Sequence, residues 1–138
     1  MKKIMVASDG SDHSTRALKK AIQIGSSQES VTIDLVYVVD GDTSKADVLH
    51  YGDSDTASFK RQKMMEQQAE IAREAGLQTD IKILHGSASE TLIDYANNGS
   101  YDLVLVGSRG RNKLQTMLLG SVSHKLIKHI DAPVMVVK

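Results

Sequence analysis

The amino-acid sequence predicts an α/β protein: a doubly wound parallel sheet of five strands with helices on both faces. Two observations lead to this fold class. Short apolar runs alternate along the chain with segments of helical periodicity, which is the pattern of repeated βαβ units. Most of these runs contain few polar residues, as expected of strands buried on both faces. The length of 138 residues suits a single domain over 1–138.

The first half of the chain is expected to hold two strands, two helices and one irregular segment. The strands are expected at Ile4–Ala7 and Val31–Val39, which are mostly apolar. A helix over Ala57–Ala75 is expected to end at Gly76, a residue type that favours the position after a helix. The aspartate-rich segment Asp40–Ser58 is expected to be an irregular, solvated loop. The helix between the two strands has one apolar face, formed by Ala17, Leu18, Ala21, Ile22 and Gly25.

The second half is expected to hold three strands separated by two helices. Thr79–Leu84 alternates polar and apolar residues, which indicates an edge strand, whereas Leu103–Val106 is wholly apolar. The last strand is Pro133–Val137, with its proline at the start, where a missing N–H does least harm. Ser87 and Glu90 have the spacing of a capping box at a helix start. The apolar faces of the two helices are formed by Leu92, Tyr95 and Ala96 and by Val122, Leu126, Ile127 and Ile130.

The composition narrows the classes of function. The chain has 17 Lys and Arg against 17 Asp and Glu, and it has no cysteine. The balanced charge argues against a general nucleic-acid binder. The lack of cysteine removes disulfides, thiolate metal sites and cysteine nucleophiles. No apolar run approaches the length of a membrane span or a secretory leader. We therefore expect a cytoplasmic protein with neither a membrane nor a nucleic acid as partner.

The most informative segment follows the fourth expected strand. Gly107 and Gly110 allow close backbone approach, which a phosphate site needs. Gly120 then begins a helix whose free N–H groups and hydroxyl-bearing residues form a ready anion site. Arg109, Arg111 and Lys113, which lie between Gly107 and Gly120, supply positive charge. We favour phosphate binding over the alternative of a surface loop with a serine helix cap. The residues concerned are Gly107, Arg109, Gly110, Arg111, Lys113, Gly120, Ser121, Val122 and Ser123.

The loop after the first strand is a second candidate. If the strand order reverses between the first and fourth strands, Asp9 points into the same crevice as Gly107. A carboxylate there suits a ribose hydroxyl or a Mg²⁺ ion. Asp9 could instead cap the first helix, and both roles are compatible because Ser11 can serve as the cap.

Histidine chemistry offers little support for an enzyme. His13 and His85 could both approach the carboxyl edge of the sheet, but no cysteine or acidic residue pairs with them at metal spacing. The sequence contains no nucleophile elbow and no P-loop. We therefore expect neither a catalytic nor a metal-ligating set of side chains.

These residues resemble the universal stress protein family, and the resemblance covers the chain from Ile4 to Val137. Nucleotide-binding members of that family carry Gly-x2-Gly-x9-Gly-[Ser/Thr]. The chain matches this motif at every position, with Gly107, Gly110, Gly120 and Ser121. The turn Asp9-Gly10-Ser11 after the first strand and the closing segment Ala132–Val137 are also similar.

The resemblance implies a Rossmann-like sheet of order 3-2-1-4-5, ATP in the crevice and a homodimer. It places adenine and ribose against Ala7, Ser8, Asp9 and the backbone of Val38. It places the phosphates against Gly107, Arg109, Gly110, Gly120, Ser121, Val122 and Ser123.

Three hypotheses of function follow. The first is an ATP-binding regulatory or stress-response protein, holding ATP with Mg²⁺ and hydrolysing it slowly or not at all. The second is an interaction module of the same fold that works without nucleotide, and the third is a weak ATPase. In the implied strand order Val134–Val137 is an edge without charge or proline, so we expect a homodimer through this strand.

Overall fold

The computed structural model describes residues 1–109 and 119–138, with the backbone alone described at 42 and 43. This part of the chain forms five strands and five helices. In chain order they are β1 (Lys3–Ala7), α1 (Asp12–Ser26), β2 (Thr32–Val39), α2 (Gly41–Tyr51), α3 (Ser54–Glu74), β3 (Gln78–His85), α4 (Ala88–Asn98), β4 (Leu103–Gly107), α5 (Ser121–His129) and β5 (Val134–Val137).

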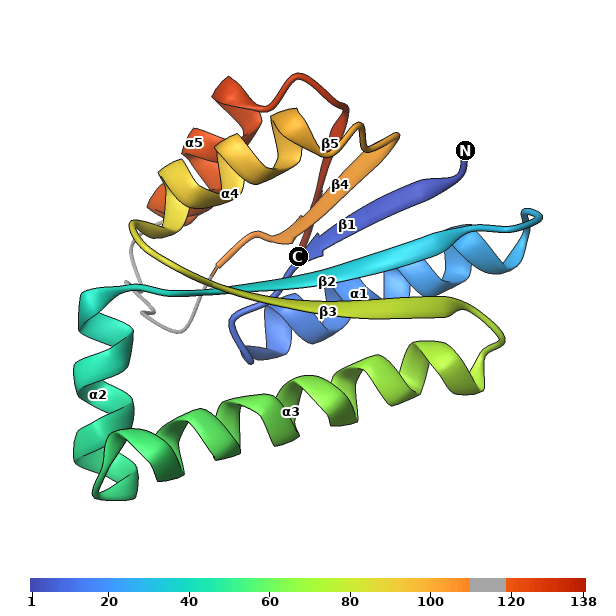
Figure 1. The fold of residues 1–138 in the computed structure, drawn as a ribbon. Coiled ribbons are helices and arrows are strands. Elements are labelled where there is room, and N and C mark those ends of the chain that lie inside the picture. The colour runs from blue at the N-terminus through green and yellow to red at the C-terminus, as the bar shows by residue number, and fades with distance from the viewer. Residues whose placement is uncertain (110–118) are drawn as a thin grey trace.

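The strands form one parallel sheet of order β3-β2-β1-β4-β5. Figure 1 shows α1 and α3 on one face of the sheet and α4 and α5 on the other. The predicted fold class and the 3-2-1-4-5 order are therefore confirmed, and the strand at Thr79–Leu84 is an edge strand as expected. None of the helices that the structure describes is long and apolar enough to cross a membrane.

Two aliphatic cores hold the helices to the sheet, one on each face. On the first face Leu18 of α1 and Met65 of α3 pack against the sheet, and both are fully buried. On the second face Leu92 of α4 and Leu126 of α5 are buried against the same strands. Alternate residues of β1 and β4 enter opposite cores, because successive strand side chains point to opposite faces. The central strands are thereby covered on both sides.

The prediction of an irregular segment at Asp40–Ser58 is wrong, because α2 and the start of α3 occupy these residues. Asp53 begins α3 as its N-cap, accepting a hydrogen bond of 2.7 Å from the Thr56 N–H. That bond lowers the pKa of the Asp53 carboxyl below its ordinary value. A buried ion pair of 2.9 Å joins Asp47 of α2 to Arg61 of α3.

One helix end and one residue of a helix face also differ from expectation. Ser87 precedes α4, but within the described part of the chain its side chain makes no capping hydrogen bond, so the expected capping box with Glu90 does not form. Ile127, expected on the apolar face of the last helix, is 45% exposed. The cap of the long helix is as predicted, since Gly76 follows α3 with a positive φ of 87°.

Candidate functional site

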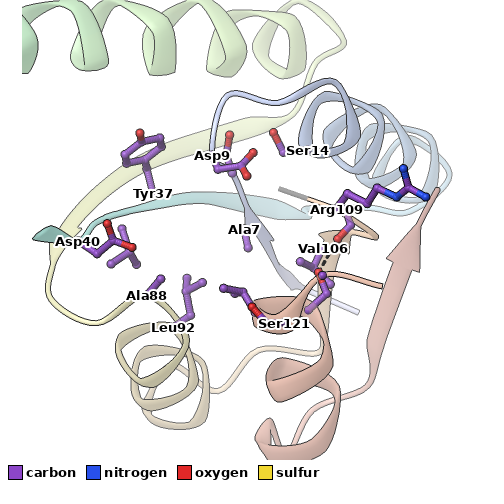
Figure 2. A pocket seen from close by; sticks show the side chains of 16 residues that line it. Ala7, Asp9, Ser14, Tyr37, Asp40, Ala88, Leu92, Val106, Arg109 and Ser121 are labelled. Carbon is purple, nitrogen blue, oxygen red and sulfur yellow. Dashed lines mark hydrogen bonds between the residues drawn. The ribbon is translucent and has the colours of Figure 1, made fainter. Parts of the chain in front are cut away.

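A pocket opens at the carboxyl ends of the central strands, where the strand order reverses between β1 and β4. Open parallel sheets bind ligands at this position. Figure 2 shows that β1, β2 and β4, together with α4 and α5, contribute side chains to it. The pocket encloses about 190 Å³. Its walls are formed by Ala7, Ser8, Asp9, Ser14, Tyr37, Val38, Asp40, Ala88, Leu92, Val106, Gly107, Arg109, Gly120, Ser121, Val122 and Ser123.

The loop after β1 presents Asp9 to the pocket. Asp9 Oδ1 accepts a hydrogen bond of 2.9 Å from the Ser11 N–H, which closes a short turn. Gly10 completes that turn with a φ of 79°, a conformation that favours glycine. Ser11 then caps α1 by accepting from the Ser14 N–H at 3.2 Å. The cap is therefore Ser11, and Asp9 holds the turn at the pocket wall.

The end of β4 is hydrogen-bonded to α5 and packs closely against α1. The Ser123 hydroxyl donates to the Gly107 carbonyl at 2.7 Å, and the Gly120 N–H donates to the Ser108 carbonyl at 2.7 Å. These two bonds join the end of β4 to the start of α5. A Cβ at Gly107 would lie 2.8 to 2.9 Å from backbone and Cβ atoms of His13, so only glycine fits at this position.

The start of α5 carries the features of an anion site. Gly120 is the N-cap, and among the described residues no side chain caps this helix. The N–H groups of its first turn, at Ser121, Val122 and Ser123, have no acceptor within the helix. The positive end of the helix dipole lies at the same place. Ser121 is the first helical residue and is not the N-cap, which removes the structural role that was its alternative.

Arg109 adds the positive charge at this end of the pocket. It follows Ser108 directly and lies in the pocket wall with the first residues of α5. In Figure 2 its guanidinium extends away from Ser121. A phosphate at the start of α5 would therefore use Arg109 after a change of side-chain rotamer, which a partly exposed arginine makes readily.

The opposite wall of the pocket is apolar. It combines Val38 of β2 with Ala88 and Leu92 of α4, and Leu92 is nearly fully buried. Asp40 stands at the edge of this wall, one residue before α2, and Figure 2 places it across the opening from Asp9. A flat apolar ring suits such a wall, and two carboxylates beside it suit hydroxyl groups.

All the predicted site residues that the structure describes line this one pocket. Gly110, Arg111 and Lys113 lie outside the described residues. Reasoning from the sequence missed Asp40, which had been placed in a solvated segment. It also missed five further residues of the wall: Ser14, Tyr37, Ala88, Leu92 and Val106. A signal existed for Asp40 and Val106, because each lies at the carboxyl end of a strand; the α4 residues gave none.

Residues 1–109 and 119–138 contain no group of three or more histidine, cysteine or acidic side chains that could hold a metal ion. His13 does not line the pocket, and its Nδ1 lies 3.1 Å from the Ser108 Oγ. His85 ends β3 and is exposed. The pocket thus presents hydrogen-bond donors and a cation at one end, and an apolar wall with carboxylates at the other.

The fold and the pocket define a class: a Rossmann-like α/β protein with a polar site where its strand order reverses. The chain belongs to the universal stress protein family, whose family model matches residues 1–138. A curated relative, the universal stress protein YxiE of Bacillus subtilis, is 31% identical over 99% of this chain and 98% of its own.

Solved structures agree with this assignment. One described as the structure-based assignment of the biochemical function of hypothetical protein MJ0577 has a TM-score of 0.88 and 26% identity, over 99% of this chain and 95% of that one. The universal stress protein from Archaeoglobus fulgidus in complex with dAMP has a TM-score of 0.75 and 20% identity, over 100% of this chain and 98% of that one. At this identity, the similarity to the second structure shows a shared fold alone.

Proposed function

We propose that this chain is an ATP-binding regulatory or stress-response protein that retains its nucleotide and hydrolyses it slowly or not at all. One observation carries the proposal: the start of α5, which no side chain of the described residues caps, opens into the same pocket as Arg109 and an apolar wall. Donors and positive charge at one end with an apolar surface at the other match a nucleoside phosphate. The Archaeoglobus fulgidus protein of the same fold, described in complex with dAMP, supports an adenine nucleotide.

The phosphates are assigned to the β4–α5 end of the pocket. The N–H groups of Ser121, Val122 and Ser123 and the exposed Ser121 hydroxyl donate to phosphate oxygens, and Arg109 balances their charge. Gly107 lets α1 approach the end of β4 closely, and the motif assigns Gly110 to close backbone approach at the phosphates. All these groups hold charge without moving a proton, which favours retention over turnover.

The base and ribose are assigned to the other end. Adenine packs on Val38, Ala88 and Leu92, and the family resemblance assigns the Val38 backbone to its edge. Ala7 and Ser8 form the floor, where β1 ends. Asp9 accepts from a ribose hydroxyl. The two carboxylates that line the pocket, Asp9 and Asp40, lie at this end and are oxygen ligands of the kind that Mg²⁺ prefers. The ion itself is assigned to the nucleotide phosphates.

The assembly we propose is a homodimer formed through β5. This strand pairs with β4 on one side, and its other edge is open in the described residues. It is apolar throughout, and Met135 is 37% exposed. Open apolar edges favour symmetric pairing with a second copy. We further propose that residues 1–138 act as one domain in the cytoplasm, where a chain without cysteine needs no oxidising environment.

Thermal unfolding with and without nucleotide tests the proposal. We expect Mg-ATP at millimolar concentration to raise the Tm, because a ligand that binds the folded state alone stabilises it. The double variant Gly110→Val, Gly120→Val should lose the shift, while Gly41→Ala should keep it because a Cβ at Gly41 meets open space. If Mg-ATP does not raise the Tm of the parent protein, the proposal fails, and the alternative of an interaction module that works without nucleotide is favoured. Turnover well above background and lost in Asp9→Asn would indicate the ATPase.

A further inference from the structure

A contact outside the pocket links α1 to Ser108, the residue between β4 and Arg109. His13 is the second residue of α1, and its Nδ1 lies 3.1 Å from the Oγ of Ser108, the first residue after β4. Neither residue lines the pocket. The hydroxyl can donate to the ring or accept from it, so the hydrogen bond forms in either tautomer of the imidazole.

Ser108 joins the end of β4 to β5 and to the start of α5. Its N–H donates to the Val137 carbonyl at 2.8 Å, which ties it to β5. Its carbonyl accepts from the Gly120 N–H at 2.7 Å, which ties it to the N-cap of α5. The side-chain bond to His13 is the third tie, and Ser108 is only 6% exposed. The position of Gly120 therefore depends on the position of Ser108.

The neighbouring residue shows how closely α1 and β4 approach. A Cβ at Gly107 would lie 2.8 Å from the carbonyl carbon of His13, which places the first turn of α1 directly on the strand end. On the far side, the Ser123 hydroxyl donates to the Gly107 carbonyl at 2.7 Å. The end of β4 is thus fixed from one face by His13 and from the other by Ser123.

We propose that His13 is a positioning residue for the phosphate half of the nucleotide site, acting through Ser108. This inference rests on the proposed function. The residues assigned to the phosphates, Arg109 and the start of α5, adjoin Ser108 or are hydrogen-bonded to it. The residues assigned to the base, Val38 and Leu92, belong to other elements. Loss of the His13 side chain therefore weakens the hold on phosphates and leaves the hold on adenosine.

Binding of ATP and of adenosine to a His13→Ala variant, measured by calorimetry, tests this. We expect the affinity for ATP to fall about threefold to tenfold, which corresponds to about 0.6–1.4 kcal/mol and is the size of one hydrogen bond. The affinity for adenosine should change less than twofold. His13→Asn should restore ATP binding in part, because the asparagine amide can stand in for Nδ1. His129→Ala, an exposed histidine of α5, is the matched control.

Ser108→Ala should reproduce the effect of His13→Ala, and the double variant should add little to either, as expected for two partners in one contact. Equal losses for ATP and adenosine, or no loss for ATP, would overturn the proposal. A parent that binds neither ligand would instead overturn the proposed function.

Amide hydrogen exchange in the ligand-free protein tests the positioning by itself. His13→Ala should speed exchange at the Gly120 N–H, whose acceptor is the Ser108 carbonyl. Unchanged exchange at Gly120 would contradict it, whatever the protein binds.

Discussion

The hydroxyl of Tyr101 donates a buried hydrogen bond of 2.6 Å to Oδ2 of Asp34. Asp34 lies on β2 and is 4% exposed; Tyr101 precedes β4 and is 7% exposed. The Nζ of Lys3 lies 4.6 Å from the centre of the Tyr101 ring. A buried carboxylate is costly without a donor, so this contact helps a polar residue to occupy strand β2.

Replacing Tyr101 with phenylalanine removes that donor and keeps the ring. The buried carboxylate then lacks a partner, and we expect the free energy of unfolding to fall by about 1–3 kcal/mol. Urea denaturation monitored by circular dichroism measures this. Tyr51→Phe is the control, because Tyr51 is exposed at the end of α2 and should change little. Equal stabilities of the two variants would contradict the role given to the contact.

The same contact predicts how stability changes in alkali. Burial and the Asp34 carboxylate raise the pKa of Tyr101 well above the ordinary value of 10.0. The unfolded chain then loses this proton at a lower pH than the folded chain, so the stabilisation is complete below pH 10 and declines as the pH rises beyond it. Tyrosinate absorbance should show that the parent has one more phenol ionising only with unfolding than the Tyr101→Phe variant has. Complete ionisation while the chain stays folded would contradict this.

The buried ion pair between Asp47 and Arg61 predicts a non-additive pair of substitutions. Both side chains are less than 10% exposed, at 5% and 8%. Arg61→Met removes the cation that lies 2.9 Å from the buried Asp47 carboxylate, which should cost about 3–5 kcal/mol of unfolding free energy. Adding Asp47→Leu removes the buried carboxylate as well and should restore most of the loss. Denaturation of the two variants measures the difference, and a double variant no more stable than Arg61→Met would refute the argument.

Gly107 predicts a local effect at the site. An alanine Cβ there would press on the His13 backbone at 2.8 to 2.9 Å, so the start of α1 or the end of β4 must shift. We expect Gly107→Ala to lower the unfolding free energy by about 1–3 kcal/mol, the usual cost of overpacking, and to weaken ATP binding. Gly41→Ala adds the same methyl group in open space and is the matched control. Parallel denaturation and binding measurements separate the two effects.

The sequence predicted the strands well because their apolar runs are short and bounded, as at Leu103–Val106. It did not predict α2, because the buried contact of that helix with α3 includes the pair Asp47–Arg61, so that part of its buried face is polar. A periodicity of apolar residues cannot reveal such a helix.

Part of the candidate site could likewise be predicted from the sequence, and part could not. Asp9 and the start of α5 follow from local sequence, since a loop after a strand and a glycine before a helix are visible in the chain. Ala88 and Leu92 enter the pocket because α4 packs across the sheet toward α5. Their place depends on tertiary packing, which the spacing of residues in one segment does not encode.

Calorimetric titration of Mg-ATP into the purified chain tests the central claim most directly. We predict saturable binding of one nucleotide per chain at submillimolar concentration, and its loss in Gly120→Val, which alters the N-cap of α5. Absence of binding up to several millimolar ATP, or equal binding by the parent and Gly120→Val, would contradict the assignment of this pocket as the nucleotide site.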